Sequence, residues 1–109
     1  MKLLHEAASR RTALDERDRL AVRARLREAL TEYLPSGSEI WLYGSLARPG
    51  RFRDWSDIDL ALADEPRGMS IYRLMSLLAE RTERPVDLVL LGETRLRADI
   101  LEKGERWTL

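Results

Sequence analysis

The sequence predicts an α/β domain of the α+β type, in which helices pack on a small mixed β-sheet. Three segments have the apolar alternation of strands, and three have the apolar spacing of helices. The strand segments are 39–43, 57–63 and 86–91, and the helical segments are 14–34, about 70–81 and about 95–103. Helices and strands that alternate along a chain pack as layers around one core. The strand order does not follow from the sequence.

Composition restricts the class of protein. The 109 residues are expected to form one domain, 1–109, in which residues 1–12 are either a poorly ordered leader or an extension of the first helix. The 19 basic and 19 acidic residues cancel, which makes nucleic acid an unfavoured partner. There is no cysteine for a disulfide or a thiolate metal site. Without a signal-peptide pattern or a long apolar run, we expect a cytoplasmic protein with no membrane contact.

The first helix is predicted over Leu14–Leu34. Its apolar positions recur at helical spacing and are Val22, Leu26, Ala29, Leu30 and Tyr33. Five arginines occupy much of the remaining surface: Arg17, Arg19, Arg23, Arg25 and Arg27. Because acids alternate with them, we interpret them as a solvated or partner-facing surface rather than a nucleic-acid site. His5, without a partner nearby in sequence, is interpreted as a surface residue.

The later elements have recognisable boundaries. Ser70 is a predicted N-cap for a helix whose inward stripe is Ile71, Leu74, Met75 and Leu78. Thr94 is a predicted cap for the last helix, which ends at Gly104 and whose inward residues are Leu96, Ile100 and Leu101. Residues 105–109 are a candidate edge strand. Trp41 and Tyr43 are interpreted as core residues of the first strand.

Two acids open the second strand. Side chains alternate between the faces of a strand, so Asp57 and Asp59 share one face while Ile58 points to the other. Two carboxylates at this spacing repel each other unless a cation lies between them, and hard oxygen ligands suit Mg²⁺. The pattern predicts a magnesium site that takes phosphate oxygens as further ligands.

A Gly-Ser turn follows the first strand. Gly44 permits close backbone approach, and the Ser45 hydroxyl with the following amides can bind a phosphate. Arg48, Arg51 and Arg53 add positive charge nearby. A Gly-Ser pair, an Asp-x-Asp strand or a basic loop is, taken singly, usually an ordinary turn, solvated edge or solvated charge. Their order and spacing, with eleven residues between Ser45 and Asp57, favour a nucleotide site.

In this combination the segment resembles the signature of the nucleotidyltransferase superfamily that includes DNA polymerase β. The residues Gly44-Ser45-Leu46-Ala47-Arg48 and Ser56-Asp57-Ile58-Asp59-Leu60 are similar to those of the minimal nucleotidyltransferases, short prokaryotic proteins often encoded beside a HEPN-domain partner. The resemblance spans roughly 40–101 and implies the nucleotidyltransferase fold. Pro49 departs from the pattern, because members commonly place Gly directly after the Arg.

A third acid, Asp87, begins the otherwise apolar third strand. From the residues alone it is either a solvated strand end or, if this strand lies beside the second, a third carboxylate of one cluster. The resemblance favours the cluster, since the family places an acid on the corresponding strand.

The resemblance further implies a mechanism. Asp57, Asp59 and Asp87 would be the catalytic residues and the ligands of two Mg²⁺ ions, with Asp87 as a candidate general base. Gly44, Ser45 and Arg48 would bind the triphosphate of ATP, and Arg48 would offset charge on the leaving pyrophosphate. The acceptor would be a hydroxyl on a HEPN toxin, to which the protein transfers AMP as its antitoxin.

Other functions stay open. One is an antitoxin that masks its partner by binding alone, and another is transfer to a small molecule such as an aminoglycoside. Addition to nucleic-acid ends is disfavoured by the neutral charge. A homo-oligomer is also open, and Trp55 or Trp107 would mark an interface if exposed.

Overall fold

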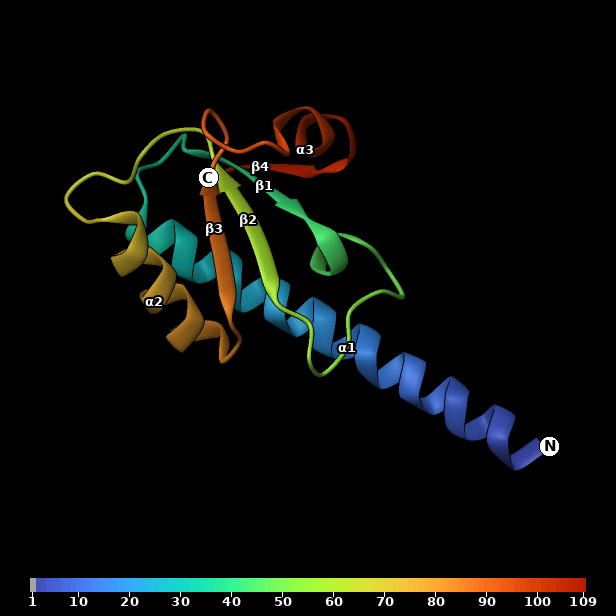
Figure 1. Cartoon of the computed structure of the whole chain (residues 1–109). Helices are drawn as coiled ribbons and strands as arrows, with labels where there is room; N and C mark the ends of the chain where they lie inside the picture. Colours follow the sequence, from blue (N-terminus) through green and yellow to red (C-terminus); the bar gives the residue numbers. More distant parts are fainter. Residues whose placement is uncertain (1) are drawn as a thin grey trace.

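The computed structural model describes the backbone of residues 2–109 and the side chains from Ser9 onward, and it confirms the predicted class. Within this part of the chain, helices pack against a four-stranded mixed sheet (Figure 1). The elements are α1 (Lys2–Tyr33), β1 (Glu39–Tyr43), the short 3₁₀ helix η1 (Gly44–Ala47), β2 (Ile58–Leu62), α2 (Ile71–Thr82), β3 (Val86–Leu90), α3 (Arg97–Lys103) and β4 (Glu105–Thr108).

The sheet has the order β3-β2-β1-β4. Strand β1 pairs antiparallel with β2 and with β4, while β2 pairs parallel with β3. The predicted edge strand near the C-terminus is thus β4. The third strand lies beside the second, as the cluster interpretation of Asp87 requires.

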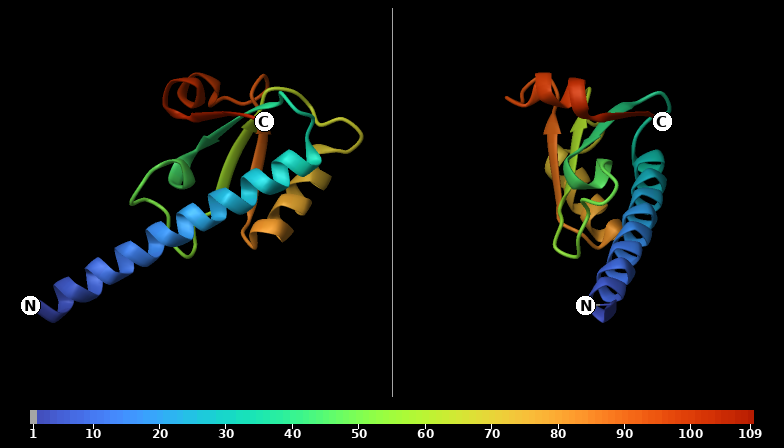
Figure 2. Two further views of the ribbon diagram at one scale, coloured as in Figure 1. Left: turned by 180° about the vertical axis from the view of Figure 1, so that it is seen from behind. Right: turned by 90° about the vertical axis from the view of Figure 1, so that its right-hand side faces the viewer.

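Helices cover the two faces of the sheet unequally. Helices α1 and α2 lie side by side on one face, where they enclose the main core of residues such as Leu26, Leu42 and Leu60 (Figure 2). Helix α3 covers only part of the other face, where Ile100 packs against Trp41 and Ala61. The rest of that face is left accessible, and it carries the acids of β2 and β3.

Helix α1 begins at Lys2, so it includes residues 2–12, for which the sequence left a leader or an extension of the first helix open. The side chain of Leu14, where the apolar spacing begins, is exposed. Apolar periodicity reports burial, and the side chains of residues 9–14 are all exposed, so periodicity alone does not detect this part of the helix. His5 lies outside the residues whose side chains are described. None of the helices, over the described residues, has the length and apolar character needed to cross a membrane.

The capping predictions have different outcomes. Ser70 is the N-cap of α2, and its hydroxyl accepts a hydrogen bond from the Arg73 amide at 3.0 Å. The prediction for Thr94 was wrong, because its hydroxyl accepts a hydrogen bond from the Leu96 amide in a turn that precedes α3. Leu96 and Leu101 were also predicted to point inward, but both are about half exposed. Of the seven residues of α3, Ile100 is the buried one.

The helix arginines are not a uniform solvated surface. Arg19 is buried, and its guanidinium donates to the carbonyl of Leu46 at 2.9 Å. Arg23 donates to the same carbonyl at 3.4 Å and forms an ion pair with Glu105 at 2.5 Å. These two arginines therefore join α1 to η1 and β4, which corrects the interpretation of the row as surface charge.

Arg84 fixes the loop that leads into β2. Its guanidinium donates to the carbonyls of Arg53, at 2.7 Å, and Ser56, at 3.2 Å. It also pairs with Asp18 of α1 and lies 4.3 Å from the ring centroid of Phe52. One mostly buried cation thereby orders the residues directly before Asp57.

Candidate active site

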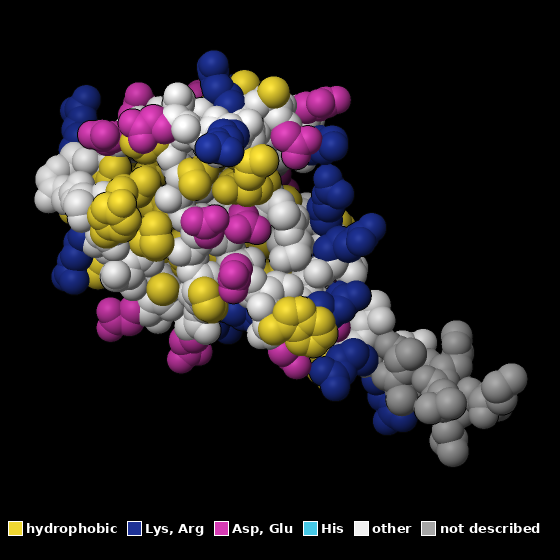
Figure 3. Space-filling view, in the orientation of Figure 1, with side chains coloured by type: hydrophobic (Ala, Val, Ile, Leu, Met, Phe, Trp, Pro, Cys, Tyr) yellow, Lys and Arg dark blue, Asp and Glu magenta, His cyan; other side chains and the backbone are white. Residues whose placement is uncertain are grey.

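Three carboxylates lie on the accessible face of the sheet. Asp59 is the register partner of Asp87 on β3 and of Tyr43 on β1, so these three side chains form a row across the strands. Asp57 lies two residues before Asp59 and shares its face. Figure 3 shows acidic side chains gathered at the centre of this face, over β2 and β3, with apolar side chains on either side.

Asp57, Asp59 and Asp87 place three negative charges close together. Partial burial, then the charges of Asp87 and Asp57, raise the pKa of Asp59 to about 6. Partial burial and the charges of Asp59 and Asp87 raise the pKa of Tyr43 to about 12, so its phenol is neutral. The side chains of Asp57 and Asp87 are exposed. The site therefore holds negative charge that a cation would neutralise.

The carboxylate set fits a hard divalent cation. It consists of oxygen donors, and two of its members are exposed and free to reorient. Among the residues that the structure describes, no three acidic or histidine side chains are already gathered closely enough to hold one metal ion together. Joint ligation by Asp57, Asp59 and Asp87 thus stays a prediction that requires the exposed pair to turn toward the ion.

Gly44 packs directly against Asp59. A Cβ atom at residue 44 would lie 2.4 Å from Oδ2 of Asp59, and the backbone φ of Gly44 is +73°. The backbone conformation disfavours a side chain at residue 44, and the Asp59 carboxylate would have to move to admit one. The Gly44-Ser45 turn, named the phosphate turn below for its predicted role, is consequently in contact with the half-buried Asp59 carboxylate, although Gly44 and Asp59 are 15 positions apart in sequence.

Pro49 is accommodated in a turn. The Arg51 amide donates to the Arg48 carbonyl at 3.3 Å, and Gly50, with a φ of +78°, follows Pro49. Proline second and a glycine of positive φ third are the pattern of a type II β-turn. The residue that departs from the family pattern therefore extends the loop without unfolding it, and it places Arg48 and Arg51 at the two ends of one turn.

A hollow of about 470 Å³ lies beside the phosphate turn. Its lining residues are Tyr43, Gly44, Ser45, Arg48, Arg51, Asp99 and Lys103. Three of the predicted site residues, Gly44, Ser45 and Arg48, are thus brought together, and the row of carboxylates adjoins them through Tyr43 and Gly44. Sequence patterns gave no role to Tyr43 at the site or to Lys103, because only the folded register brings β1 and α3 to this hollow.

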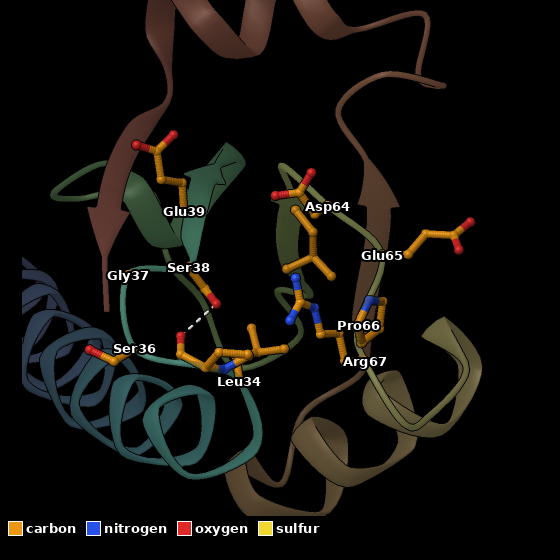
Figure 4. Close-up of a pocket in the computed structure, with 11 residues that line it drawn as sticks. Leu34, Ser36, Gly37, Ser38, Glu39, Asp64, Glu65, Pro66 and Arg67 are labelled. Atoms are coloured by element: carbon orange, nitrogen blue, oxygen red, sulfur yellow. Dashed lines mark hydrogen bonds between the residues drawn. The ribbon is translucent and has the colours of Figure 1, made fainter.

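A larger hollow, of about 510 Å³, lies at the other end of the sheet. It is bounded by the loop after α1 and the loop after β2, and Figure 4 shows Arg67 directed into it. Ser38 also lines this hollow, and its hydroxyl donates a hydrogen bond to the Pro35 carbonyl at 2.6 Å (Figure 4). None of the predicted site residues lines it, so size alone does not identify the active site here.

Comparison with known proteins agrees with this geometry. A family model described as polymerase beta, nucleotidyltransferase, matches residues 26–106, which include every predicted site residue. No match is found among curated proteins.

Several solved structures are similar to this chain. One, described as a toxin-antitoxin with AMP-PNP, is 26% identical with a TM-score of 0.62, over 79% of this chain and 73% of that one. Another, a Shewanella oneidensis tri-AMPylated HEPN toxin in complex with MNT antitoxin, is 23% identical with a TM-score of 0.59, over 84% and 73%. A third, described as the toxin-antitoxin MntA-HepT, is 23% identical with a TM-score of 0.58, over 83% and 73%.

We predict that Gly44→Ala destabilises the protein more than Gly50→Ala. Both glycines have positive φ, so both substitutions cost roughly 1 kcal/mol of backbone strain. A Cβ at Gly50 meets nothing within 4 Å, whereas one at Gly44 meets Asp59. The additional loss of unfolding free energy for Gly44→Ala should be about 1–3 kcal/mol, measured by urea denaturation.

The double variant Gly44→Ala/Asp59→Ala identifies the source of this loss. Removing Oδ2 of Asp59 should abolish the additional loss and leave only the backbone strain. Equal losses for the two single variants would contradict the contact.

The raised pKa of Asp59 predicts a pH-dependent stability of the metal-free protein. The pKa of about 6 in the folded state exceeds the ordinary aspartate value of 3.8, so the folded state binds the proton more tightly. This stabilisation is present below about pH 4 and is lost as the pH rises through about 6. Asp59→Asn cannot ionise, so its advantage over the parent should grow between pH 4 and 7.5.

Between these pH values the difference in unfolding free energy between Asp59→Asn and the parent should increase by about 1–2 kcal/mol, after allowance for partial exposure. Urea unfolding at a series of pH values measures it. Stability curves that stay parallel for parent and variant would contradict the charge repulsion.

Proposed function

Because the chain belongs to the polymerase β nucleotidyltransferase family, we propose that it transfers AMP from ATP to a hydroxyl group on a protein partner. The partner we propose is a HEPN-domain toxin, for which this protein acts as antitoxin. The observation that carries the proposal is the row of Asp59 and Asp87 across two strands, with Gly44 of the phosphate turn against Asp59.

The residues divide into two groups by charge. Asp57, Asp59 and Asp87 would hold Mg²⁺, and the two-ion arrangement that the family resemblance implies is part of this proposal. Bound Mg²⁺ supplies positive charge at the phosphates and lowers the pKa of a coordinated hydroxyl. Arg48, with the Ser45 hydroxyl, lines the hollow on the other side of Gly44 and supplies donors to the triphosphate.

Transfer then requires one bond to form and one to break. The acceptor oxygen attacks the α-phosphorus of ATP, and the bond to the bridging oxygen breaks so that pyrophosphate leaves. Asp87 is exposed beside Asp59 and is the proposed base that takes the hydroxyl proton. Arg48 offsets the charge that develops on pyrophosphate.

The accessibility of the site supports an external acceptor. Asp57 and Asp87 are exposed, and the side chain of Trp55 in the preceding loop is 78% exposed. Trp107, the other tryptophan considered for an interface, is buried beneath Arg23 and Arg27. A macromolecule is therefore able to approach the carboxylates on the Trp55 side.

The choice of ATP and of a toxin partner comes from similarity. The solved structure that is 26% identical is a toxin-antitoxin described with AMP-PNP, a triphosphate analogue. The HEPN identity of the partner is also what the minimal-nucleotidyltransferase motif implies. A location in the cytoplasm stays a prediction from the sequence.

We predict that Asp57→Ala and Asp59→Ala each lower transfer by at least about 100-fold while the protein stays folded. Each substitution removes a ligand from the cation that catalysis needs. The measurement is transfer of label from α-³²P-ATP to the HEPN-domain protein proposed as partner, with circular dichroism to check folding.

Asp64→Ala is the matched control, because Asp64 is an exposed acid at the opposite end of β2 and should leave transfer unchanged. Near-normal transfer by Asp59→Ala would refute the proposal. A carboxylate variant that still neutralises the toxin would instead favour masking by binding alone, and transfer to an aminoglycoside without any protein would favour a small-molecule acceptor.

A further inference from the structure

The hollow beside the phosphate turn is lined from two distant parts of the sequence. Arg48 and Arg51 come from the turn after η1, and Lys103 with Asp99 come from α3. Three cations and one acid thus line a hollow that also contains the Ser45 hydroxyl. This surplus of positive charge contrasts with the zero net charge of the chain.

Two of these cations are unengaged within the described part of the chain. Neither Arg48 nor Arg51 forms an ion pair there, although Arg11, Arg19, Arg23, Arg53 and Arg84 do. The type II turn fixes their spacing at its first and fourth positions. Their guanidinium groups are consequently available to an anion without loss of an existing pair.

The backbone that carries the third cation, Lys103, is held by tight packing. A Cβ on Gly104 would lie 2.5 Å from the Ile100 carbonyl oxygen and 3.2 Å from that of Leu42, so the end of α3 lies directly against β1. Glu105 pairs with Leu42 in the sheet register and with Arg23, which also bonds to Leu46 of η1. Gly104 and Glu105, which follow Lys103, are therefore joined to β1 and η1 through backbone packing and the contacts of Arg23.

Lys103 is paired with Asp99, at 3.1 Å between Nζ and Oδ1. Both side chains are more than half exposed, at 55% and 60%. An exposed pair four residues apart on a helix is weak, so a polyanion is able to replace Asp99 as the partner of Lys103. Asp99, which lines the same hollow, therefore competes with a bound anion for Lys103.

We propose that Lys103 and Arg51 bind the polyphosphate tail of the nucleotide, and that Asp99 weakens this binding by pairing with Lys103. The inference rests on the proposed function, because it assigns residues to the same nucleotide site. It adds Lys103 and Arg51, and a competing acid, to the residues already proposed to bind the triphosphate of ATP.

The test compares ATP with AMP on the full chain in the presence of Mg²⁺. Lys103→Gln should weaken ATP binding about 5- to 10-fold and change AMP binding by less than about 2-fold, because one charge-assisted contact to the tail is lost. Asp99→Asn should strengthen ATP binding about 2- to 5-fold, because the competing carboxylate is gone. Titration calorimetry measures both.

Two controls separate this role from general effects. Lys103→Arg keeps the charge and should stay within about 3-fold of the parent. Arg97→Gln makes the same charge change on α3 at an exposed residue that does not line the hollow, and it should leave ATP affinity unchanged. If the pair were only a helix-stabilising contact, Lys103→Gln and Asp99→Asn would lower thermal stability alike and alter neither affinity.

The outcomes distinguish the two proposals. Parent-like ATP affinity in Lys103→Gln, equal weakening of ATP and AMP, or weaker ATP binding by Asp99→Asn would overturn this inference and leave the proposed function standing. Equal affinity of the parent protein for AMP and ATP would also overturn this inference and leave the proposed function standing. A parent that binds no nucleotide with Mg²⁺ would overturn both.

Discussion

The close contact between Gly44 and the Asp59 carboxylate is the constraint on which the site depends. It joins the end of β1 to the beginning of β2, where a side chain at residue 44 would meet Oδ2 at 2.4 Å. Asp59 is also in register with Asp87, so it contacts the phosphate turn on one side and lies beside the third carboxylate on the other. A half-buried acid beside two others is costly to ionise, and its raised pKa records that cost. A cation that removes the cost is the natural counterpart of this arrangement.

The arginines explain how a chain with no net charge maintains a strongly polar site. Arg19 and Arg23 of α1 hold η1 from the core side through the Leu46 carbonyl. Arg84 holds the carbonyls of the loop before Asp57 and pairs with Asp18. Arginines that add nothing to the net charge of the chain thus hold loops in position. Arg48 and Arg51, by contrast, line the hollow. Net charge describes long-range attraction and says little about local sites.

Local patterns predicted the strands and the helix cap well. The alternation in 39–43 and the hydroxyl of Ser70 are signals contained within a few residues, and the structure confirms both. Local patterns left the conformation of residues 1–12 open, and they did not predict the exposure of Leu96 and Leu101, because burial depends on which other elements pack there. Leu101 has an apolar side chain at helical spacing but no element above it.

The site was predictable where its residues share one motif and unpredictable where the register assembles it. Gly44, Ser45, Asp57 and Asp59 belong to one stretch of sequence. The place of Asp87 required the parallel pairing of β2 with β3, for which the family resemblance supplied the expectation. Tyr43 and Lys103 join the site through contacts between distant segments, and no spacing rule connects them.

The central claim is that the carboxylate row and the phosphate turn form one metal-dependent nucleotide site. Titration calorimetry of ATP with and without Mg²⁺, on the parent and on Asp57→Ala/Asp59→Ala, tests it most directly. The account predicts ATP binding that requires Mg²⁺ in the parent and is lost in the double variant. ATP binding that is unchanged by removal of Mg²⁺, or that persists in the double variant, would contradict it.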